Sequence, residues 1–365
     1  MSHLPSARVP HPFALALLAL AGLPACAQIY DIDAHRYVHG ALFQPGDTQD
    51  CGSLKCSLPK SMQERVDAAA APGNTEFRNA VALLSGAGSH DLPAALAAYE
   101  RAADLGHPVA QYNLGLMALR GVARARDPAE AARRFRQAAR QGMPAAQVQL
   151  SQLLAAGSGV EKNSAEAVDW AKKAARTRFP DADFTLGVYY ENGLGVPRDL
   201  PAAADSFRKA ASQGHAAAQL HLGQLYLDGQ GVEKNPALAA GEWQSAAAAG
   251  LPAAQHNLGL LYFRGEGVEQ NAAKAGVWFR QAAKAGYAPS QLTLGLMCLE
   301  GRGVTKDEAQ AFQWLSLAAA QNNPAAGTAL DELKKQLTPE QRTEGERLLT
   351  DWAKDHSAAA AAPNS

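Results

Sequence analysis

Residues 216–250 read AAAQLHLGQLYLDGQGVEKNPALAAGEWQSAAAAG, and this stretch decides the fold because its features recur every 36 residues. The pair Leu222-Gly223 is matched in phase by Leu114-Gly115, Leu150-Ser151, Leu186-Gly187, Leu258-Gly259 and Leu294-Gly295. A small residue stands four positions before each Leu, as Ala218 does, and an apolar residue stands four positions after it, as Tyr226 does. The spacing i, i+4, i+8 places such residues on one side of a helix. The sequence therefore predicts one amphipathic helix in each period.

A turn signal follows five of these helices in the form Gly-x-Gly-Val, as in Gly229-Gln230-Gly231-Val232. Glycine tolerates left-handed backbone, so the helix can end and the chain can reverse there. A second helix is then expected to begin after a side chain that accepts hydrogen bonds from its first amides, namely Asn163, Asp199, Asn235, Asn271 or Asp307. This second helix carries an aromatic residue, with Trp278 expected as a buried anchor, and it usually ends at a glycine. Arg178 replaces that glycine in one unit, where we expect an irregular turn.

These residues resemble the Sel1-like repeat, a relative of the tetratricopeptide repeat, whose pattern is A-x-x-x-L-G-x-x-Y-x-x-G-x-G-V followed by A-x-x-W-x-x-A-A-x-x-G. The resemblance covers about residues 110–321 in six units, with a fainter unit upstream and an incomplete first helix downstream. It implies an all-α fold, a right-handed superhelical solenoid of stacked antiparallel helix pairs, which we place at residues 76–337. Thr338-Pro339-Glu340-Gln341 then predicts the start of a C-terminal capping helix over residues 338–356, and residues 357–365 are expected to form a disordered tail.

The first 27 residues are expected to be a cleavable secretory signal, because one Arg precedes an apolar run of eleven residues that is too short to span a membrane. Two processing routes fit. Ala25 and Ala27 form an A-x-A site for cleavage before Gln28, whereas Leu23-Pro24-Ala25-Cys26 resembles a bacterial lipobox with Cys26 as the lipidated residue. No later transmembrane segment is expected, so the predicted location is the periplasm, either soluble or anchored to the outer membrane through Cys26.

Residues 28–75 belong to no repeat and contain the closely spaced pair Cys51 and Cys56. In an oxidising compartment this spacing predicts a small disulfide-closed loop. Zinc is the alternative, but a tetrahedral site needs a second close pair of ligands. Cys298 occupies a helix position that is apolar in other repeats, so we expect it to be a buried small hydrophobe.

The composition argues against nucleic-acid binding, because 34 Lys and Arg nearly balance 35 Asp and Glu. Catalytic patterns are also weak. Ser57-Leu58-Pro59-Lys60 matches the S-x-x-K of penicillin-recognising enzymes, yet no S-D-N or K-T-G partner occurs. The Gly-x-Gly turns follow no predicted strand, so they are helix breaks and not phosphate loops. No catalytic residue, metal site or cofactor is therefore predicted.

The first helices are apolar on a second side, and by resemblance to tetratricopeptide arrays this side lines a concave surface. The predicted partner-binding residues on it are Tyr112, Leu116, Arg120, Phe184, Val188, Glu191, His256, Leu260, Phe263 and Arg264. The surface would be rimmed with mixed charge by Arg120, Asp228, Arg264 and Glu300. Two interpretations stay open at this point. The columns either form a true groove for a helix or extended segment of a partner, or they are ordinary packing between repeats.

The function expected from these features is that of a non-catalytic scaffold or adaptor, which acts by binding another protein and not by converting a substrate. Exported members resembling this family assemble secretion or polysaccharide machinery or act as immunity proteins that neutralise a toxin, so the expected partner is an envelope protein or a periplasm-acting toxin. The alternatives are a hydrolase acting on β-lactams or peptidoglycan, as described for cysteine-rich relatives, and an envelope assembly lipoprotein. The chain is expected to be a monomer.

Overall fold

The computed structural model describes residues 72–85 and 91–361, and every regular element in these ranges is an α-helix. The helices fall into two compact units that divide between Arg198 and Asp199. The N-terminal unit contains α3 (Asn74–Ser85), α4 (Leu92–Asp104), α5 (Pro108–Arg120), α6 (Pro128–Arg140), α7 (Pro144–Ala156), α8 (Ser164–Ala175) and α9 (Pro180–Asn192). The C-terminal unit contains α10 (Leu200–Ala211), α11 (Ala216–Asp228), α12 (Pro236–Ala248), α13 (Pro252–Arg264), α14 (Ala272–Lys284), α15 (Ala288–Glu300), α16 (Glu308–Ala320), α17 (Pro324–Lys334) and α18 (Pro339–Ala361).

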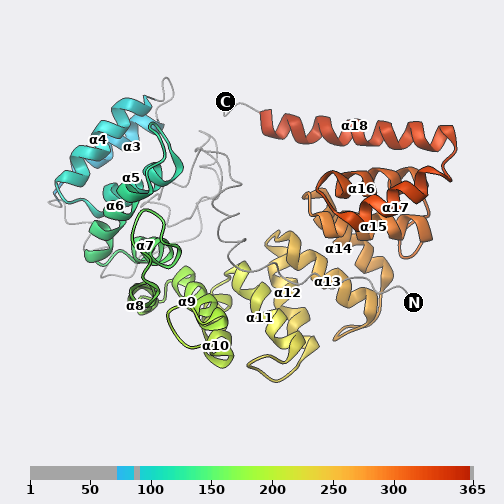
Figure 1. Cartoon of the computed structure of the whole chain (residues 1–365), viewed down its shortest axis with the longest axis horizontal. Coiled ribbons are helices and arrows are strands. Elements are labelled where there is room, and N and C mark those ends of the chain that lie inside the picture. The colour runs from blue at the N-terminus through green and yellow to red at the C-terminus, as the bar shows by residue number, and fades with distance from the viewer. Residues whose placement is uncertain (1–71, 86–90, 362–365) are drawn as a thin grey trace, which may run out of the picture. The chain divides into compact units, whose positions relative to one another are not determined.

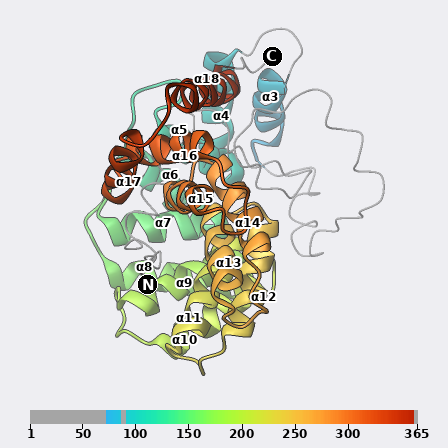
Figure 2. The same ribbon diagram turned by 90° about the vertical axis from the view of Figure 1, so that its right-hand side faces the viewer.

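Within each unit, helices that follow one another in the chain pack side by side (Figure 1). The predicted first helices are the odd-numbered α5 to α15, and the second helices are the even-numbered α6 to α16. In the C-terminal unit, α11 to α16 lie next to one another in chain order (Figure 2). The predicted all-α solenoid of stacked antiparallel helix pairs is therefore confirmed. None of the described helices is both long enough and apolar enough to cross a bilayer.

Some predictions lie outside the described residues. They are the signal segment 1–27 with Cys26, and the pair Cys51 and Cys56 in the segment that precedes the repeats. Cys298 is described, and it is a free, buried cysteine as expected. Burial raises the pKa of its thiol to about 11, so the group stays protonated and packs as a hydrophobe.

The second helices begin where the sequence predicts. Asn235 accepts a hydrogen bond from the amide of Leu238 at 3.0 Å, and Asp127, Asn163, Asp199, Asn271 and Asp307 cap their helices in the same way. The first helices end at the first glycine of each turn, as at Gly229, where φ is 69°. Both boundaries therefore follow from local chemistry.

The second glycine of each turn makes the tightest contact between repeats. At Gly267 φ is 70°, and an added Cβ would overlap the backbone of Pro236 at the start of the preceding second helix. Gly159, Gly195, Gly231 and Gly303 meet the corresponding residues of their own preceding repeats. This glycine is thus required both for its backbone conformation and for the close approach of two repeats.

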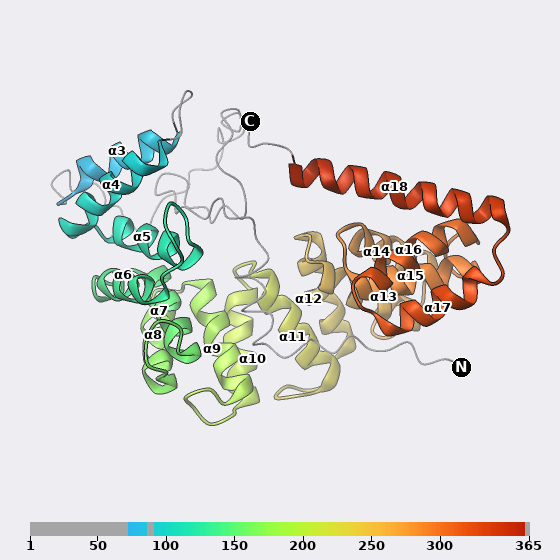
Figure 3. The same cartoon turned by 45° about the horizontal axis from the view of Figure 1, so that its top comes forward.

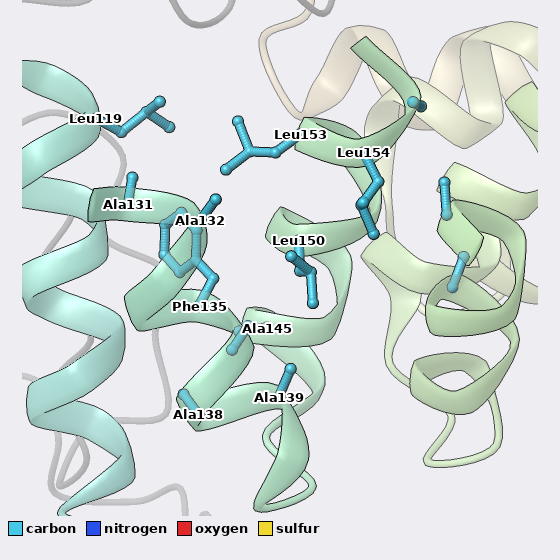
Figure 4. Packing of buried hydrophobic residues seen from close by; sticks show 14 of the residues in the cluster. Leu119, Ala131, Ala132, Phe135, Ala138, Ala139, Ala145, Leu150, Leu153 and Leu154 are labelled. Carbon is cyan, nitrogen blue, oxygen red and sulfur yellow. The ribbon is translucent and has the colours of Figure 1, made fainter. Parts of the chain in front are cut away.

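The glycine in each first helix receives a large side chain from the second helix. An added Cβ at Gly115 would lie 2.6 Å from the ring of Phe135, and at Gly259 it would lie 2.8 Å from Phe279. Phe135 and the leucines of α7 point into the space between the helices in Figure 4. In the repeat where Ser151 replaces glycine, the position of the aromatic residue is occupied by the small Ala171. A large side chain on the second helix is thus paired with glycine on the first helix, and a small one is paired with serine.

One predicted anchor was wrong. Trp278 is only half-buried, whereas its neighbour Phe279 is fully buried and faces Gly259. The sequence pattern allows an aromatic residue at either of two adjacent positions, and these point about 100° apart around a helix. Only the second of them faces the glycine of the first helix.

The turn at Arg178 is regular, contrary to the prediction. Arg178 adopts φ 58°, and Gly142, Gly214, Gly250 and Gly286 occupy the equivalent positions with φ between 82° and 86°. The arginine thus takes up the left-handed conformation although its Cβ disfavours it. The hydrogen bond from the Arg178 amide to the carbonyl of Ala175 keeps the same turn closed, as the Gly142 amide does with Ala139.

The C-terminal end of the array is covered by α18, which lies along α16 (Figure 3). Thr338 and Gln341 form the predicted reciprocal cap, in which each side chain accepts from the other's amide, at 3.2 and 2.9 Å. The side-chain amide of Gln313 donates to the carbonyl of Leu348 at 3.0 Å, and Gly345 lies against the ring of Phe312. The helix continues to Ala361 and so enters the predicted disordered tail, because alanine has the highest helix propensity.

A glutamine hydrogen bond that the sequence did not predict recurs in five repeats. Gln255 donates to the carbonyl of Ala247 at 3.2 Å, across the turn between a second helix and the next first helix. Gln111, Gln147, Gln219 and Gln291 make the same bond to carbonyls eight residues earlier. Each bond gives a second donor to a carbonyl at a helix C-terminus that already accepts from the amide of the glycine three residues later.

These glutamines are linked between repeats at two places. Gln141 donates to the side-chain oxygen of Gln111 at 2.8 Å and to the carbonyl of Gly106 at 2.9 Å. Gln321 makes the equivalent pair of bonds to Gln291 and Gly286. Ala285 occupies the same turn position one repeat earlier, and there the buried side-chain oxygen of Gln255 has no partner.

We therefore expect Ala285→Gln to stabilise the C-terminal unit by about 1 kcal/mol, because it supplies the missing donor to Gln255. The backbone is already suitable, with φ −77° and ψ 8° at Ala285 against φ −83° and ψ 4° at Gln141. Urea unfolding followed by circular dichroism measures the gain. Ala285→Met is the control, since it has similar length and no donor. Equal midpoints for the two variants would contradict the assignment.

Candidate partner-binding surface

Half of the predicted partner-binding residues are buried inside the chain. Tyr112, Leu116, His256, Leu260 and Phe263 are at most 7% exposed. These residues belong to α5 and α13, and each of these helices packs against both the preceding and the following second helix, so its second apolar side is also core. As direct contacts for a partner these five assignments are therefore wrong, and the interpretation as packing between repeats holds for them.

The other predicted residues are accessible. Phe184, Val188 and Glu191 of α9 and Arg120 at the end of α5 are half-buried, and Arg264 at the end of α13 is exposed. Phe184 and Val188 are four residues apart and share one side of α9. Asp228 and Glu300 occupy the same helix-end position as Arg264 in the two adjacent repeats and are also exposed.

We call the exposed helix-end residues Asp228, Arg264 and Glu300 of the C-terminal unit the helix-end row. Its charges alternate in sign from one repeat to the next, and half-buried Leu227 and Leu299 adjoin its two acidic members in sequence. Beside Arg264, the guanidinium of Arg302 lies 4.0 Å above the ring of Phe263 and shields it. This contact was not predicted, because Arg302 comes from the turn of the next repeat, which follows α15.

His256 packs between repeats and is unavailable to a ligand. Its Nδ1 atom lies 2.8 Å from the hydroxyl oxygen of Ser290, and its ring packs near Phe279 and Tyr287. Burial, together with the charge of Arg264, lowers its pKa to about 4. Burial lowers the pKa of His107 to about 4 as well. Its Nδ1 atom accepts from the amide of Ala110 at the start of α5.

Acid is therefore expected to weaken the fold. Unfolded histidine has a pKa of about 6.5, so stability from neutral His256 is complete above that pH and is lost as pH falls toward 4, with about 2 kcal/mol lost per histidine at pH 5. Urea unfolding at pH 7.5 and 5.0 tests this. His256→Leu should reduce the acid loss, because Leu220 and Leu292 occupy the same position in adjacent repeats. An unchanged acid loss in that variant would contradict a role for His256.

The described residues offer little to a small molecule or a metal. A hollow lined by Leu96, Leu114 and Met117 has about 10 Å³ of room, close to what one water needs. Its polar side is closed by ion pairs of Arg124 with Glu100 and of Arg134 with Glu130. Within residues 72–85 and 91–361, no group of three His, Cys, Asp or Glu side chains is placed to hold a metal ion.

A series of stacked helix pairs is the defining feature of helical-repeat proteins. Proteins of this class bind their partners on an extended surface and not in a cavity. The Sel1 repeat family model matches residues 80–107, 108–143, 144–176, 180–215, 216–251, 252–287 and 288–323. The chain belongs to the Sel1 repeat family, and the fainter upstream unit is one of its repeats. Proteins of this family are scaffolds for protein–protein interaction and are in general not catalytic.

Several solved structures are similar to this chain, and the first one described here agrees with the family assignment. A Sel1 repeat protein from Oxalobacter formigenes is 31% identical, covers 76% of this chain and 83% of its own, and has a TM-score of 0.63. An immunity protein from Pseudomonas aeruginosa is 24% identical over 58% of this chain and 81% of its own, with a TM-score of 0.41. A protective antigen of uropathogenic Escherichia coli is 20% identical over 82% of this chain and 95% of its own, with a TM-score of 0.36. No curated protein matches the sequence.

Proposed function

We propose that this chain is a non-catalytic scaffold that binds a partner protein through the accessible residues of its first helices. The observation that carries the proposal is the helix-end row, in which Asp228, Arg264 and Glu300 are all exposed at one position of three consecutive first helices. Charges arranged in this way favour a partner whose charges have the opposite sign at the matching spacing. They contribute more to specificity than to affinity. On the N-terminal unit, Phe184 and Val188 supply half-buried apolar area of the kind found at interface cores.

The proposed location is the bacterial periplasm. It is supported by the charge, apolar run and small residues of segment 1–27, which lies outside the described structure. Amino-terminal sequencing of the exported protein tests it, with Gln28 expected as the first residue. Incorporation of labelled palmitate at Cys26 would instead identify an outer-membrane lipoprotein.

A narrower form of the proposal is an immunity protein that neutralises a toxin acting in the periplasm. It requires one tight cognate partner, whereas a scaffold for secretion or polysaccharide assembly requires several weaker ones. A toxin gene next to the gene for this chain would favour the narrower form. Titration of the captured partner then separates the two, because an immunity complex is expected to have a nanomolar or lower Kd.

The described structure gives no support to a hydrolase. Ser290 and His256 are in hydrogen-bonding distance, as nucleophile and base would be, but Ser290 is fully buried and His256 is 2% exposed. A substrate carbonyl cannot approach the hydroxyl in this position. The pair therefore links two repeats.

The test is affinity capture from an envelope extract with quantitative mass spectrometry. A variant carrying Asp228→Lys, Arg264→Glu and Glu300→Lys reverses the helix-end row and should reduce partner recovery at least about tenfold, a loss of about 1.4 kcal/mol of binding free energy. The matched control is Gln244→Lys with Gln281→Lys, which makes the same net charge change at exposed positions of α12 and α14. Equal recovery by wild type and the reversed variant would rule out this surface.

A further inference from the structure

Arg178 keeps a strained backbone that its repeat does not require. Five of the equivalent turns have glycine at this position and one has Asn322 with φ 59°, whereas Arg178 adopts φ 58°. The Arg178 side chain is exposed, and it forms no ion pair in the described structure, so it adds no visible packing. Backbone strain that brings no structural gain is characteristic of functional positions.

Three further cations belong to the same two repeats: Lys172 and Arg176 stand just before Arg178 at the end of α8, and Arg140 holds the position of Arg176 one repeat earlier. Arg140, Lys172 and Arg176 are exposed and, like Arg178, form no ion pair within the described ranges. Two of the acidic side chains of the same helices are engaged elsewhere, since Glu130 binds Arg133 and Arg134, and Glu166 lies 3.7 Å from Arg136, whereas Asp169 of α8 is exposed. We call Arg140, Lys172, Arg176 and Arg178 the basic edge.

The basic edge spans two adjacent turns of one compact unit. Arg140 and Arg176 occupy the same position, 36 residues apart, at the ends of α6 and α8. Successive turns of the array are in contact at two places, where Gln141 hydrogen-bonds the carbonyl of Gly106 and Gln321 that of Gly286, and the turns of Arg140 and Arg178 follow the same 36-residue register. Positive charge at a helix C-terminus is favourable in itself, which accounts for Arg140, Lys172 and Arg176. It does not account for Arg178, which lies beyond the helix.

We propose that the basic edge binds an acidic segment of a partner protein, through pairing of its guanidinium groups with Asp or Glu carboxylates. This inference rests on the proposed scaffold function and adds a second contact surface to it. Three of the four cations are arginines, whose planar fork matches a carboxylate. The edge is confined to two repeats and is bordered by the exposed acid Asp169, so it suits a short acidic segment better than a continuous polyanion or a lipid surface.

The test uses the full mature chain and a fluorescein-labelled 12-residue peptide of alternating Glu and Ser, read by fluorescence anisotropy. Arg178→Gly alone is expected to raise the Kd about 2- to 5-fold, the range for one exposed ion pair. The same substitution should raise the Tm by about 2–4 °C, because it releases the strained backbone. Gain of stability together with loss of binding separates a functional arginine from a structural one.

The triple variant Arg140→Ala, Arg176→Ala, Arg178→Gly should weaken peptide binding at least about tenfold. Its control, Lys209→Ala with Lys234→Ala and Arg280→Ala, removes the same charge from exposed positions of the C-terminal unit and should bind as wild type does. Equal losses in the two triple variants would overturn the proposal. So would loss of binding to phosphatidylglycerol vesicles without loss of peptide binding.

The variant with the reversed helix-end row separates this inference from the proposed function. It should bind the Glu-Ser peptide with wild-type affinity, because Asp228, Arg264 and Glu300 lie in the other compact unit. One outcome is that partner recovery is unchanged by reversal of the helix-end row while peptide affinity still falls in the basic-edge variant. In that case only the proposal that the first helices bind the partner is rejected. If the peptide binds all variants equally, the basic edge fails and the capture result stands.

Discussion

Replacing Phe279 with alanine is expected to lower the free energy of unfolding by about 3–5 kcal/mol. The Phe279 ring is fully buried, it fills the space left by Gly259 on the adjacent first helix, and it lies 5.3 Å from the ring of His256. Truncation leaves a cavity that the two rigid helices cannot close. Urea unfolding monitored by circular dichroism measures the loss.

Trp278→Ala is the matched control for Phe279. Trp278 is the larger residue and the more conspicuous one in the sequence, but it is only half-buried. Its truncation should therefore cost about 1–2 kcal/mol, less than that of the smaller Phe279. A larger loss for Trp278 than for Phe279 would show that the packing of this repeat is assigned incorrectly.

Gly267→Ala is expected to destabilise the C-terminal unit by about 2–4 kcal/mol. Two effects combine in this estimate: left-handed backbone costs alanine about 1 kcal/mol, and overpacking costs about 1–3 kcal/mol. The overpacking arises because the new Cβ overlaps the backbone of Pro236, which cannot move away as a flexible side chain could. The free energy of urea unfolding is again the measured quantity.

Gly250→Ala isolates the backbone contribution. Gly250 has φ 85°, but no atom lies within 4 Å of an added Cβ. Its substitution should therefore cost only about 1 kcal/mol. The difference in unfolding free energy between Gly267→Ala and Gly250→Ala measures the cost of separating adjacent repeats. Equal losses at Gly250 and Gly267 would mean that the contact with Pro236 relaxes freely.

Much of the fold could be predicted because it depends on residues close together in sequence. The Leu-Gly pairs, the Asn and Asp caps and the Thr338–Gln341 cap each act within a few residues, and all appear in the structure where expected. Helix periodicity gives the angle of a side chain around its own axis. It does not give the number of neighbours that surround the helix, which is why His256 and Phe263 were predicted on the surface and lie in the core.

Other features depend on distances that only the folded turn creates. Gln255 looks like an ordinary polar surface residue, but the turn before it brings its amide to the carbonyl of Ala247. Its recurrence at Gln111, Gln147, Gln219 and Gln291 was a usable signal, since a buried polar side chain repeated in phase indicates a repeated partner. The sequence did predict the charged helix-end positions, at Arg120, Asp228, Arg264 and Glu300, because charge at a helix end is a local property.

The contact between the second glycine of a turn and the preceding second helix also bears on how such a gene can lengthen or shorten. Gly303 meets Ala272 as Gly267 meets Pro236, so excision of residues 252–287 would bring Gly303 to Pro236 with the same fit. A deletion that is not a multiple of 36 residues would shift the turn out of register with the preceding second helix. We therefore expect this array to gain or lose whole repeats in evolution, so the length of its partner-binding surface changes by one repeat at a time.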